Sequence, residues 1–280
     1  MKWNMKKFKT LVAVDFSNDS FTILQKAVDL TKKLQGVVDV VHVVENSFFS
    51  LKKDIDTIKK NSLKKLHERF PDITEDNFHC ISGKVKDTIG TTAEILNSDL
   101  VVIGKSGERY FLGDFYMGSH TKDIVRSCGS PVLVVKSEHE LNYENILMLT
   151  DLSNESAQAI QKVAILFPHA HIKLLNFYFL PFGNRLESYG FNQKEVIEYQ
   201  YSLNEDSRLK LDKFLDSLNL PSTINISGKT HQSSLNPKLF EEEVADLNFD
   251  LVAIHTTGRV SFYALDILEN SRKDVVVLRV

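Results

Sequence analysis

The 280-residue chain lacks the features that mark several large classes of protein. Its two cysteines, Cys80 and Cys128, are too few for a disulfide framework or a cysteine-ligated zinc site. No apolar run approaches the roughly 18 residues of a membrane-spanning helix, and the N-terminal sequence MKWNMKKFKT contains no apolar signal-peptide core. The formal net charge of −3 offers no basic surface for nucleic acid or an anionic membrane. We therefore expect a cytoplasmic protein that binds neither nucleic acid nor membranes.

Patterns typical of catalytic and metal sites are also missing. The nine histidines form no HExxH motif, and His169 and His171 have no cysteine or acidic residue beside them. No nucleophile–base pair and no pair of catalytic carboxylates has a recognisable spacing. The sequence therefore predicts no catalytic residues and no metal site, and it favours a binding protein over an enzyme.

Length and composition are those of an ordinary globular protein. The composition, 42% hydrophobic and 25% charged residues, is typical of chains with a packed core. At 280 residues the chain is too long for one small domain and fits two domains of about 140 residues each.

Apolar runs that resemble buried strands alternate with helical patterns through the first half of the chain. The expected strands are 8–14, 37–44, 78–82, 100–103 and 132–135. The expected helices are 21–34, about 51–70, 85–97, and a fourth that follows Gly118 and ends before Gly129. Strands and helices in strict alternation predict an α/β fold with a doubly wound parallel sheet and right-handed crossovers.

The second half of the chain repeats the first. Leu11–Ser20 (LVAVDFSNDS) matches Leu147–Ser156 (LMLTDLSNES), and Asp99–Gly104 (DLVVIG) matches Asp250–His255 (DLVAIH). Two further matches pair Ile81–Lys84 with Ile226–Lys229, and Pro131–Val135 with Asp274–Leu278. Because the blocks follow one another in the same order, we predict two tandem copies of one domain, at residues 1–137 and 143–280.

A glycine-containing stretch lies between the fourth strand and the fourth helix of the first copy. Gly104 and Gly107 follow the strand, and Gly118 and Ser119 precede the helix, with the spacing G-x2-G-x10-G-S. Glycines let the backbone approach a ligand closely, and the free N–H groups at a helix start favour a phosphate. The alternative is that the glycines only shape a turn and that Gly118-Ser119 only caps the helix.

At these residues the chain resembles the universal stress protein family, whose nucleotide-binding members carry G-x2-G-x9-G-[ST] at this place. The second gap is one residue longer here, in a loop, where a single insertion is usually tolerated. The resemblance implies two five-stranded domains of the adenine nucleotide alpha hydrolase-like type, with strand order 3-2-1-4-5. It also implies that ATP, with Mg²⁺, binds at the switch point between the first and fourth strands.

The family's contacts can be carried over residue by residue. The resemblance assigns the ribose contact to Asp15, the adenine contact to the backbone at Val43, and the phosphate contacts to Gly104, Gly107, Gly118 and Ser119. The alternative role for Asp15 is helix capping. The same residue recurs as Asp151 in the second copy, which weakens Asp15 as a specific marker of a ligand.

The second copy departs from the nucleotide-binding pattern. His255 stands where Gly104 stood, and Ser261-Phe262 takes the place of Gly118-Ser119. A phenylalanine offers no donor to a phosphate. We therefore expect the second copy to have lost nucleotide binding and to act as a built-in dimer partner, an intramolecular pseudo-dimer, while a homodimer remains a further option.

The leading functional hypothesis is a regulatory stress-response protein that binds an adenine nucleotide in its first copy. Nucleotide occupancy would order residues 105–118 and so control the docking of an unidentified protein partner. One alternative is a scaffold that binds no nucleotide and fills its own crevice with loop aromatics, which are Tyr110, Phe111, Phe115 and Tyr116. Another is a slow ATPase, against which the absence of a recognisable general base argues.

Overall fold

The computed structural model describes residues 7–45, 54–105, 119–182, 185–233, 240–257 and 262–280. The chain divides into two compact units. The first unit contains the residues up to Asn142 together with Arg272–Arg279, and the second contains Tyr143–Thr257 and Phe262–Ser271. Arg272–Arg279 thus comes from the end of the chain but belongs to the first unit. The domain bounds 1–137 and 143–280 remain a prediction from the sequence.

The first unit contains a parallel sheet that matches the predicted strand order. Its strands are β1 (Lys9–Ala13), β2 (Val37–Val44), β3 (Phe78–Ser82), β4 (Leu100–Gly104) and β5 (Val132–Val135). They lie in the order β3-β2-β1-β4-β5, and each pairs with its neighbour in parallel. The strand order 3-2-1-4-5 is therefore confirmed here. A sixth strand, β10 (Asp274–Arg279), runs antiparallel along β5.

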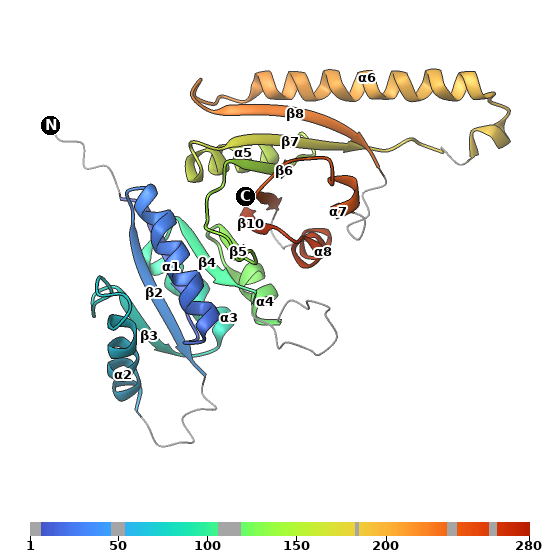
Figure 1. The fold of residues 1–280 in the computed structure, drawn as a ribbon. Helices are drawn as coiled ribbons and strands as arrows, with labels where there is room; N and C mark the ends of the chain where they lie inside the picture. Colours follow the sequence, from blue (N-terminus) through green and yellow to red (C-terminus); the bar gives the residue numbers. More distant parts are fainter. Residues whose placement is uncertain (1–6, 46–53, 106–118, 183–184, 234–239, 258–261) are drawn as a thin grey trace. The chain divides into compact units, whose positions relative to one another are not determined.

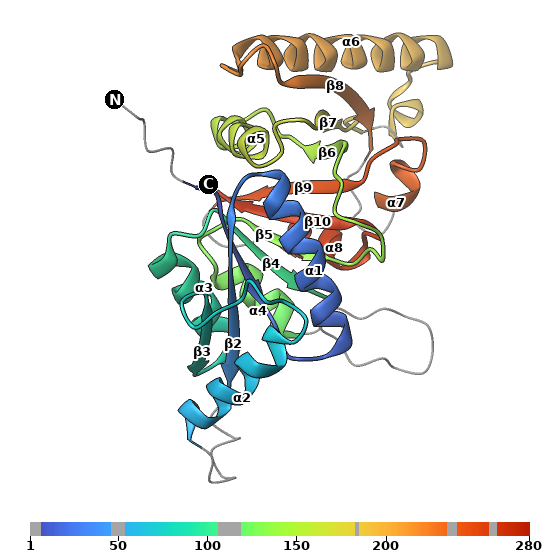
Figure 2. The ribbon, with the colours of Figure 1, turned by 60° about the vertical axis from the view of Figure 1, so that its left-hand side comes forward.

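Helices cover both faces of this sheet. They are α1 (Asn18–Lys33), α2 (Ile55–His67), α3 (Val85–Leu96) and α4 (Ser119–Ser127). Figure 2 shows α1 and α2 on one face, with α3 and α4, which contact each other, on the opposite face. Both faces are therefore buried, which explains why β4 and β5 are almost continuous apolar runs.

Helix α1 shows how the local sequence sets an element that positions the site. The Ser17 side chain accepts a hydrogen bond from the backbone N–H of Ser20, a standard N-cap. Lys32 and Lys33 in the last turn complement the helix dipole. The face turned toward the sheet is apolar and buried, and it includes Phe21, Leu24, Ala27 and Leu30.

The second unit repeats this arrangement. Its strands are β6 (Asn145–Leu149), β7 (His171–Tyr178), β8 (Asn225–Gln232) and β9 (Leu251–Thr256). They pair in parallel in the order β9-β6-β7-β8, which is the order β4-β1-β2-β3 of the first unit. The helices are α5 (Asn154–Leu166), the short η3 (Glu187–Tyr189), α6 (Gln193–Ser217), α7 (Phe240–Glu243) and α8 (Phe262–Asn270). The predicted tandem doubly wound α/β architecture is thus confirmed (Figure 1).

The repeat extends to individual hydrogen bonds. The backbone N–H of Lys9, at the start of β1, donates to Asp99 Oδ2 at 2.9 Å. The backbone N–H of Asn145, at the start of β6, donates to Asp250 Oδ2 at the same distance. Each aspartate precedes the fourth strand of its copy, so these carboxylates tie the first and fourth strands together in both copies.

One of the sequence matches proves wrong in the structure. Val41 and Leu175 are equivalent, because each accepts a hydrogen bond from the residue before the aspartate that follows the first strand. Val41 lies opposite His79, and Leu175 lies opposite Lys229. Lys229 is therefore equivalent to His79 and not to Lys84. The shared tetrapeptide ISGK lies at the end of β3 in the first copy but inside β8 in the second.

None of the helices in the described ranges is long and apolar enough to cross a membrane.

Candidate functional site

The candidate site lies where the carboxyl ends of β1, β2 and β4 meet. β1 lies between β2 and β4, and Val12 of β1 is opposite Val102 of β4. Asp15 follows β1 by two residues, and Gly104 is the last residue of β4. The two predicted site residues therefore lie at the ends of adjacent strands, at the point where the chain order reverses. In doubly wound sheets this is where ligands bind.

Asp15 holds the turn between β1 and α1. Its Oδ1 accepts hydrogen bonds from the Ser17 backbone N–H at 2.9 Å and from Ser17 Oγ at 2.6 Å. Ser17 in turn caps α1, so Asp15 supports the cap and is not the cap itself. Burial raises the pKa of the Asp15 carboxyl, but the hydrogen bonds from Ser17 and Ser20 outweigh it, and the net pKa is lowered. The carboxylate is charged at neutral pH and the residue is exposed to solvent.

Val43 lies near the end of β2, two residues beyond the last residue of β2 that is paired with β1. The Val41 carbonyl accepts a hydrogen bond from Val14 N–H, on the β1 side of β2, and the Val44 carbonyl accepts one from Gly83 N–H, on the β3 side. Backbone groups alternate between the two sides along a strand. The N–H and C=O of Val43 therefore point to the β1 side, beyond the last residue of β1. A donor and an acceptor lie side by side there.

Gly104 occupies a position with little room. A Cβ atom there would lie 2.5 Å from Ile23 Cδ1 of α1, so a larger residue needs Ile23 to move. Its carbonyl accepts a hydrogen bond from Thr121 Oγ1, in the first turn of α4, at 3.3 Å. This contact ties the start of α4 to the end of β4. Gly107, Gly118 and the Ser119 side chain lie outside the described residues, although α4 does begin at Ser119.

His42 is a site residue for which the sequence carried little signal. Its Nδ1 lies 2.8 Å from the Val14 carbonyl, which can only accept, so we assign the proton to Nδ1. The ring packs edge-on against Phe16 at 4.7 Å between centroids. Burial lowers the pKa of His42 more than the hydrogen bond to Val14 and the charge of Asp15 raise it. His42 is therefore a neutral side chain that supports the residue before Asp15.

The lowered pKa of His42 predicts a pH dependence of stability. The unfolded chain takes up a proton at this residue near pH 6.5, and the folded chain does so only at lower pH. The contribution of neutral His42 to the free energy of unfolding is therefore complete above about pH 6.5 and is lost as the pH falls through the folded-state pKa. Urea unfolding at pH 7.5 and 5.5 should show a smaller loss in His42→Asn than in the wild type. An identical loss in both proteins would contradict this assignment.

The second copy keeps the hydrogen bonds around the equivalent of Asp15 but has other residues in the places of His42 and Gly104. Asp151 Oδ1 accepts from Ser153 N–H at 3.0 Å and from Ser153 Oγ at 2.6 Å, as Asp15 does with Ser17. Asn176 Nδ2 donates to the Thr150 carbonyl at 2.9 Å, in the place of His42. His255, which replaces Gly104, has its Nε2 3.9 Å from Asp151 Oδ1.

Two opposing influences act on the pKa of the His255 imidazole. Burial lowers the pKa, and the nearby carboxylates of Asp151 and Glu155 raise it by less, so the net shift is downward. The His255 side chain is 12% exposed. The second copy therefore places a ring where the first copy has only a hydrogen atom on Gly104.

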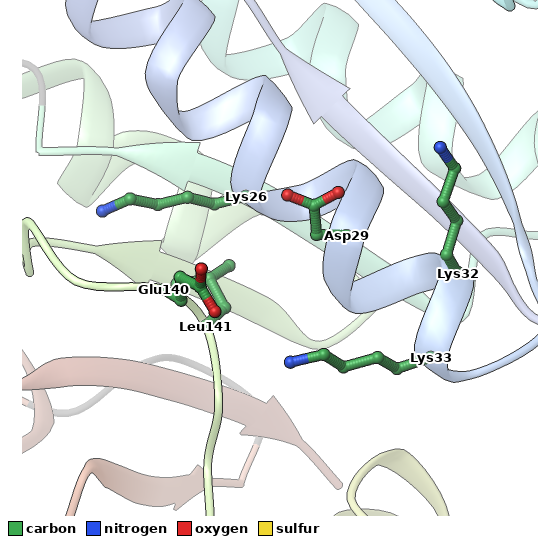
Figure 3. A pocket seen from close by; sticks show the side chains of 6 residues that line it. All are labelled: Lys26, Asp29, Lys32, Lys33, Glu140 and Leu141. Atoms are coloured by element: carbon green, nitrogen blue, oxygen red, sulfur yellow. The ribbon is translucent and has the colours of Figure 1, made fainter.

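Two cavities lie elsewhere in the first unit, and neither is lined by the predicted site residues that the structure describes. A cavity of about 310 Å³ lies between α1 and the segment after β5, and Figure 3 shows its lining side chains. Its lining mixes three lysines with two acidic residues, and one of the lysines, Lys26, donates from Nζ to the Ser137 carbonyl at 2.7 Å. A second hollow, of about 490 Å³, runs along α2. Neither is lined by Asp15, Val43 or Gly104.

Comparison with known proteins agrees with this architecture. The model of the universal stress protein family matches residues 7–136. Universal stress protein A homolog 1 of Coxiella burnetii is 30% identical to the chain over 136 residues, which are 45% of this chain and 93% of that protein. The chain belongs to the universal stress protein family.

Solved structures extend the likeness over both units. A universal stress protein from Archaeoglobus fulgidus is 15% identical, with a TM-score of 0.59 over 97% of this chain and 96% of its own. A protein of unknown function from Pseudomonas aeruginosa is 12% identical, with a TM-score of 0.63 over 98% of this chain and 93% of its own. At these identities the likeness concerns the fold alone. It shows that the tandem arrangement of this universal stress protein occurs in other chains of similar length.

Proposed function

We propose that this universal stress protein binds an adenine nucleotide, ATP with Mg²⁺, in its first copy and regulates a stress response through nucleotide occupancy. The observation that carries the proposal is that the Asp15 carboxylate, the Val43 backbone pair and Gly104 lie at the carboxyl ends of the neighbouring strands β1, β2 and β4. A charged acceptor, a backbone donor–acceptor pair and a residue without a side chain suit a ribose, a base and a phosphate chain respectively.

Each group has a distinct chemical role in this proposal. The Asp15 carboxylate accepts from ribose hydroxyls, and its Oδ1 is already oriented by Ser17. The Val43 N–H and C=O match the N1 acceptor and N6 donor of adenine, whereas guanine presents the opposite pattern. Gly104, Gly107, Gly118 and the start of α4 at Ser119 serve the phosphates. Mg²⁺ enters with the phosphates, because it usually takes phosphate oxygens and water as ligands.

In the second copy, His255 beside Asp151 supports the proposal that no nucleotide binds there. The ring stands at the position where the first copy has no side chain, and its Nε2 lies 3.9 Å from Oδ1 of Asp151, the carboxylate equivalent to the one proposed to contact the ribose. We therefore expect about one nucleotide per chain.

A matched pair of variants tests the site. Asp15→Asn removes the charge from the first copy, and Asp151→Asn makes the same change in the second. Because a hydrogen bond to a charged group contributes about 1.5–3 kcal/mol, we expect Asp15→Asn to weaken ATP binding roughly 10- to 100-fold. Asp151→Asn should leave binding unchanged. Isothermal titration calorimetry with ATP and Mg²⁺ gives both the affinity and the number of sites.

A third variant tests the phosphate loop. Gly118→Val, which adds a side chain before α4, should abolish ATP binding while circular dichroism shows an unchanged fold. Retained binding in that variant would remove this loop from the site. Failure of the wild type to bind ATP, or to be stabilised by it in a thermal melt, would overturn the proposal and favour the scaffold. Release of inorganic phosphate that is lost in Asp15→Asn would instead indicate an ATPase.

A further inference from the structure

The turn that carries Asp15 has an unfavourable backbone conformation at its centre. Phe16 has a φ of 65°, in the left-handed region, although it is not a glycine. A bulky residue is rare in this region because its Cβ crowds the backbone, and it persists only where the surrounding structure holds it. Since Phe16 lies between Asp15 and Ser17, its backbone sets how the Asp15 carboxylate meets the two Ser17 donors.

Aromatic rings from three other elements hold the Phe16 side chain. The contacts are edge-to-face, with centroid distances of 4.7 Å to His42 of β2, 5.9 Å to Phe21 of α1 and 6.5 Å to Phe78 of β3. The Lys65 ammonium group of α2 lies 5.6 Å from the centroid of the same ring. We call the rings the Phe16 cluster: Phe16, Phe21, His42 and Phe78. The cluster connects the turn after β1 to α1, β2 and β3.

The second copy keeps the same backbone conformation without these rings. Leu152, the equivalent of Phe16, has a φ of 63°. The repeat and the strand register place residues without aromatic rings at the other positions of the cluster, and they are Ala157, Asn176 and Gly228. The left-handed backbone is therefore required by the turn itself, whereas the Phe16 cluster belongs to the first copy.

A hydroxyl group supports the turn of the second copy. Thr150 Oγ1 accepts a hydrogen bond from the Leu152 N–H at 3.1 Å. The same oxygen lies 2.7 Å from Ser156 Oγ, so the hydroxyl group is itself held in place. The equivalent of Thr150 is Val14, which has no hydroxyl group to offer the Phe16 N–H. The packing of the Phe16 ring therefore takes the role that this hydrogen bond has in the second copy.

We propose that Phe16 is a positioning residue for nucleotide binding, because its packed ring fixes the turn that holds the Asp15 carboxylate toward the ribose. His42 supports both neighbours of Asp15, since its Nδ1 lies 2.8 Å from the Val14 carbonyl and its ring packs against Phe16. The free protein then already has the carboxylate in place, and the nucleotide does not have to order it. This inference rests on the proposed function for the ribose contact, whereas the order of the turn is a property of the free chain.

NMR relaxation of the free chain tests the order of the turn without nucleotide. The order parameter of the Ser17 amide should be about 0.85 in the wild type, the value of a rigid backbone. In Phe16→Gly it should fall to about 0.6 or below, because glycine accepts the left-handed backbone but has no ring to be held. Phe16→Tyr keeps the ring and should behave as the wild type does. The Ser153 amide of the second copy is the internal reference and should stay rigid throughout. A rigid Ser17 amide in Phe16→Gly would overturn the proposal.

A pair of substitutions exchanges one support for the other. Phe16→Leu removes the central ring and should loosen the turn as Phe16→Gly does. Adding Val14→Thr supplies the hydroxyl group of the second copy, and Ser20 lies at the position of Ser156. The double variant should therefore regain the order of the Ser17 amide. Wild-type order in Phe16→Leu alone would overturn the proposal, since the turn would then need neither the ring nor the hydroxyl group.

Isothermal titration calorimetry with ATP and Mg²⁺ tests the link to binding. Phe16→Gly should weaken ATP binding roughly 5- to 30-fold, since the nucleotide must then order one backbone residue that is free in the variant. In an Asp15→Asn background the same change should have little further effect, because Phe16 acts through the Asp15 carboxylate. Leu152→Gly, the matched change in the second copy, should leave the affinity unchanged. An equal loss of affinity in both backgrounds would overturn the positioning role.

The two kinds of measurement separate a failure of this inference from a failure of the proposed function. A wild type that binds no ATP, with a Ser17 amide that still loosens in Phe16→Gly, would overturn the proposed function and support the role of the ring in the turn. ATP binding of equal strength in the wild type and in Phe16→Gly would overturn this inference and leave the proposed function standing. The amides of β1 and β4 should stay rigid in every variant, which shows that the sheet is folded.

Discussion

Replacing Asp274 with alanine is expected to lower the free energy of unfolding of the first unit by about 3 kcal/mol. Asp274 is 1% exposed, at the start of β10. Its Oδ1 accepts from the backbone N–H groups of Lys136 and Ser137 at 2.6 and 2.7 Å, and its Oδ2 accepts from Ser137 Oγ at 2.8 Å. The alanine variant leaves these part-buried donors without their charged acceptor, which costs more than a surface change.

The same carboxylate ties the end of the chain to the strand beside it. Lys136 and Ser137 follow β5, so the three hydrogen bonds fasten β10 where it begins its antiparallel pairing with β5. Urea unfolding monitored by circular dichroism measures the effect. Asp266→Ala, at an exposed position on α8, is the control and should change stability by less than about 0.5 kcal/mol. A similar loss of stability in both variants would mean that the hydrogen bonds of Asp274 do not fasten β10 to the residues after β5.

The second large effect is expected for Leu211→Ala, which should destabilise the second unit by about 3 kcal/mol. Leu211 is 1% exposed and is the buried anchor of α6. A Cβ atom added at Gly228 of β8 would lie 2.8 Å from Leu211 Cδ2, so the two residues are in close contact. Shortening the side chain removes the buried contact between α6 and β8 at Gly228, beside which Leu215 also lies.

Hydrogen exchange distinguishes this effect from a general loss of stability. In Leu211→Ala the amides of α6 should exchange faster than those of β6 and β7, because the helix detaches before the sheet opens. Ile165→Ala, an exposed isoleucine on α5 in the same unit, should leave both sets unchanged. Equal acceleration in helix and sheet would indicate that α6 and the sheet open as one cooperative unit.

Local sequence signals were sufficient for most of the fold. The strands, the helices and the tandem repeat follow from apolar runs, capping residues and turn glycines, because each of these acts within a few residues of the chain. Ser17 and Ser153 cap the equivalent helices α1 and α5, at equivalent places in the repeated sequence. The strand order came from the resemblance to the family and not from periodicity, because hydrophobic patterns say which face is buried and not which strands are neighbours.

The candidate site could be predicted only in part. The roles of Asp15 and Gly104 were predicted from the resemblance to the family, and the structure places both residues at the ends of the adjacent strands β1 and β4. The orientation of the Val43 backbone depends on where β1 stops relative to β2, and that register is set by pairing across the sheet. The support that His42 gives to Val14, 28 residues away, is a contact between two strands and has no local pattern.

By itself, the sequence determined the alternation of strands and helices, the two copies, and the loss of glycine at His255. The tertiary structure alone decided that the two ISGK tetrapeptides are not equivalent, since strand register and not identity aligns β3 with β8. It alone placed Asp274 against Ser137, 137 residues away, and left residues 193–203 of α6 without a buried side chain. The physical reason is the same in each case: capping and periodicity act between near neighbours in the chain, whereas burial, pairing and charge contacts join residues that only folding brings together.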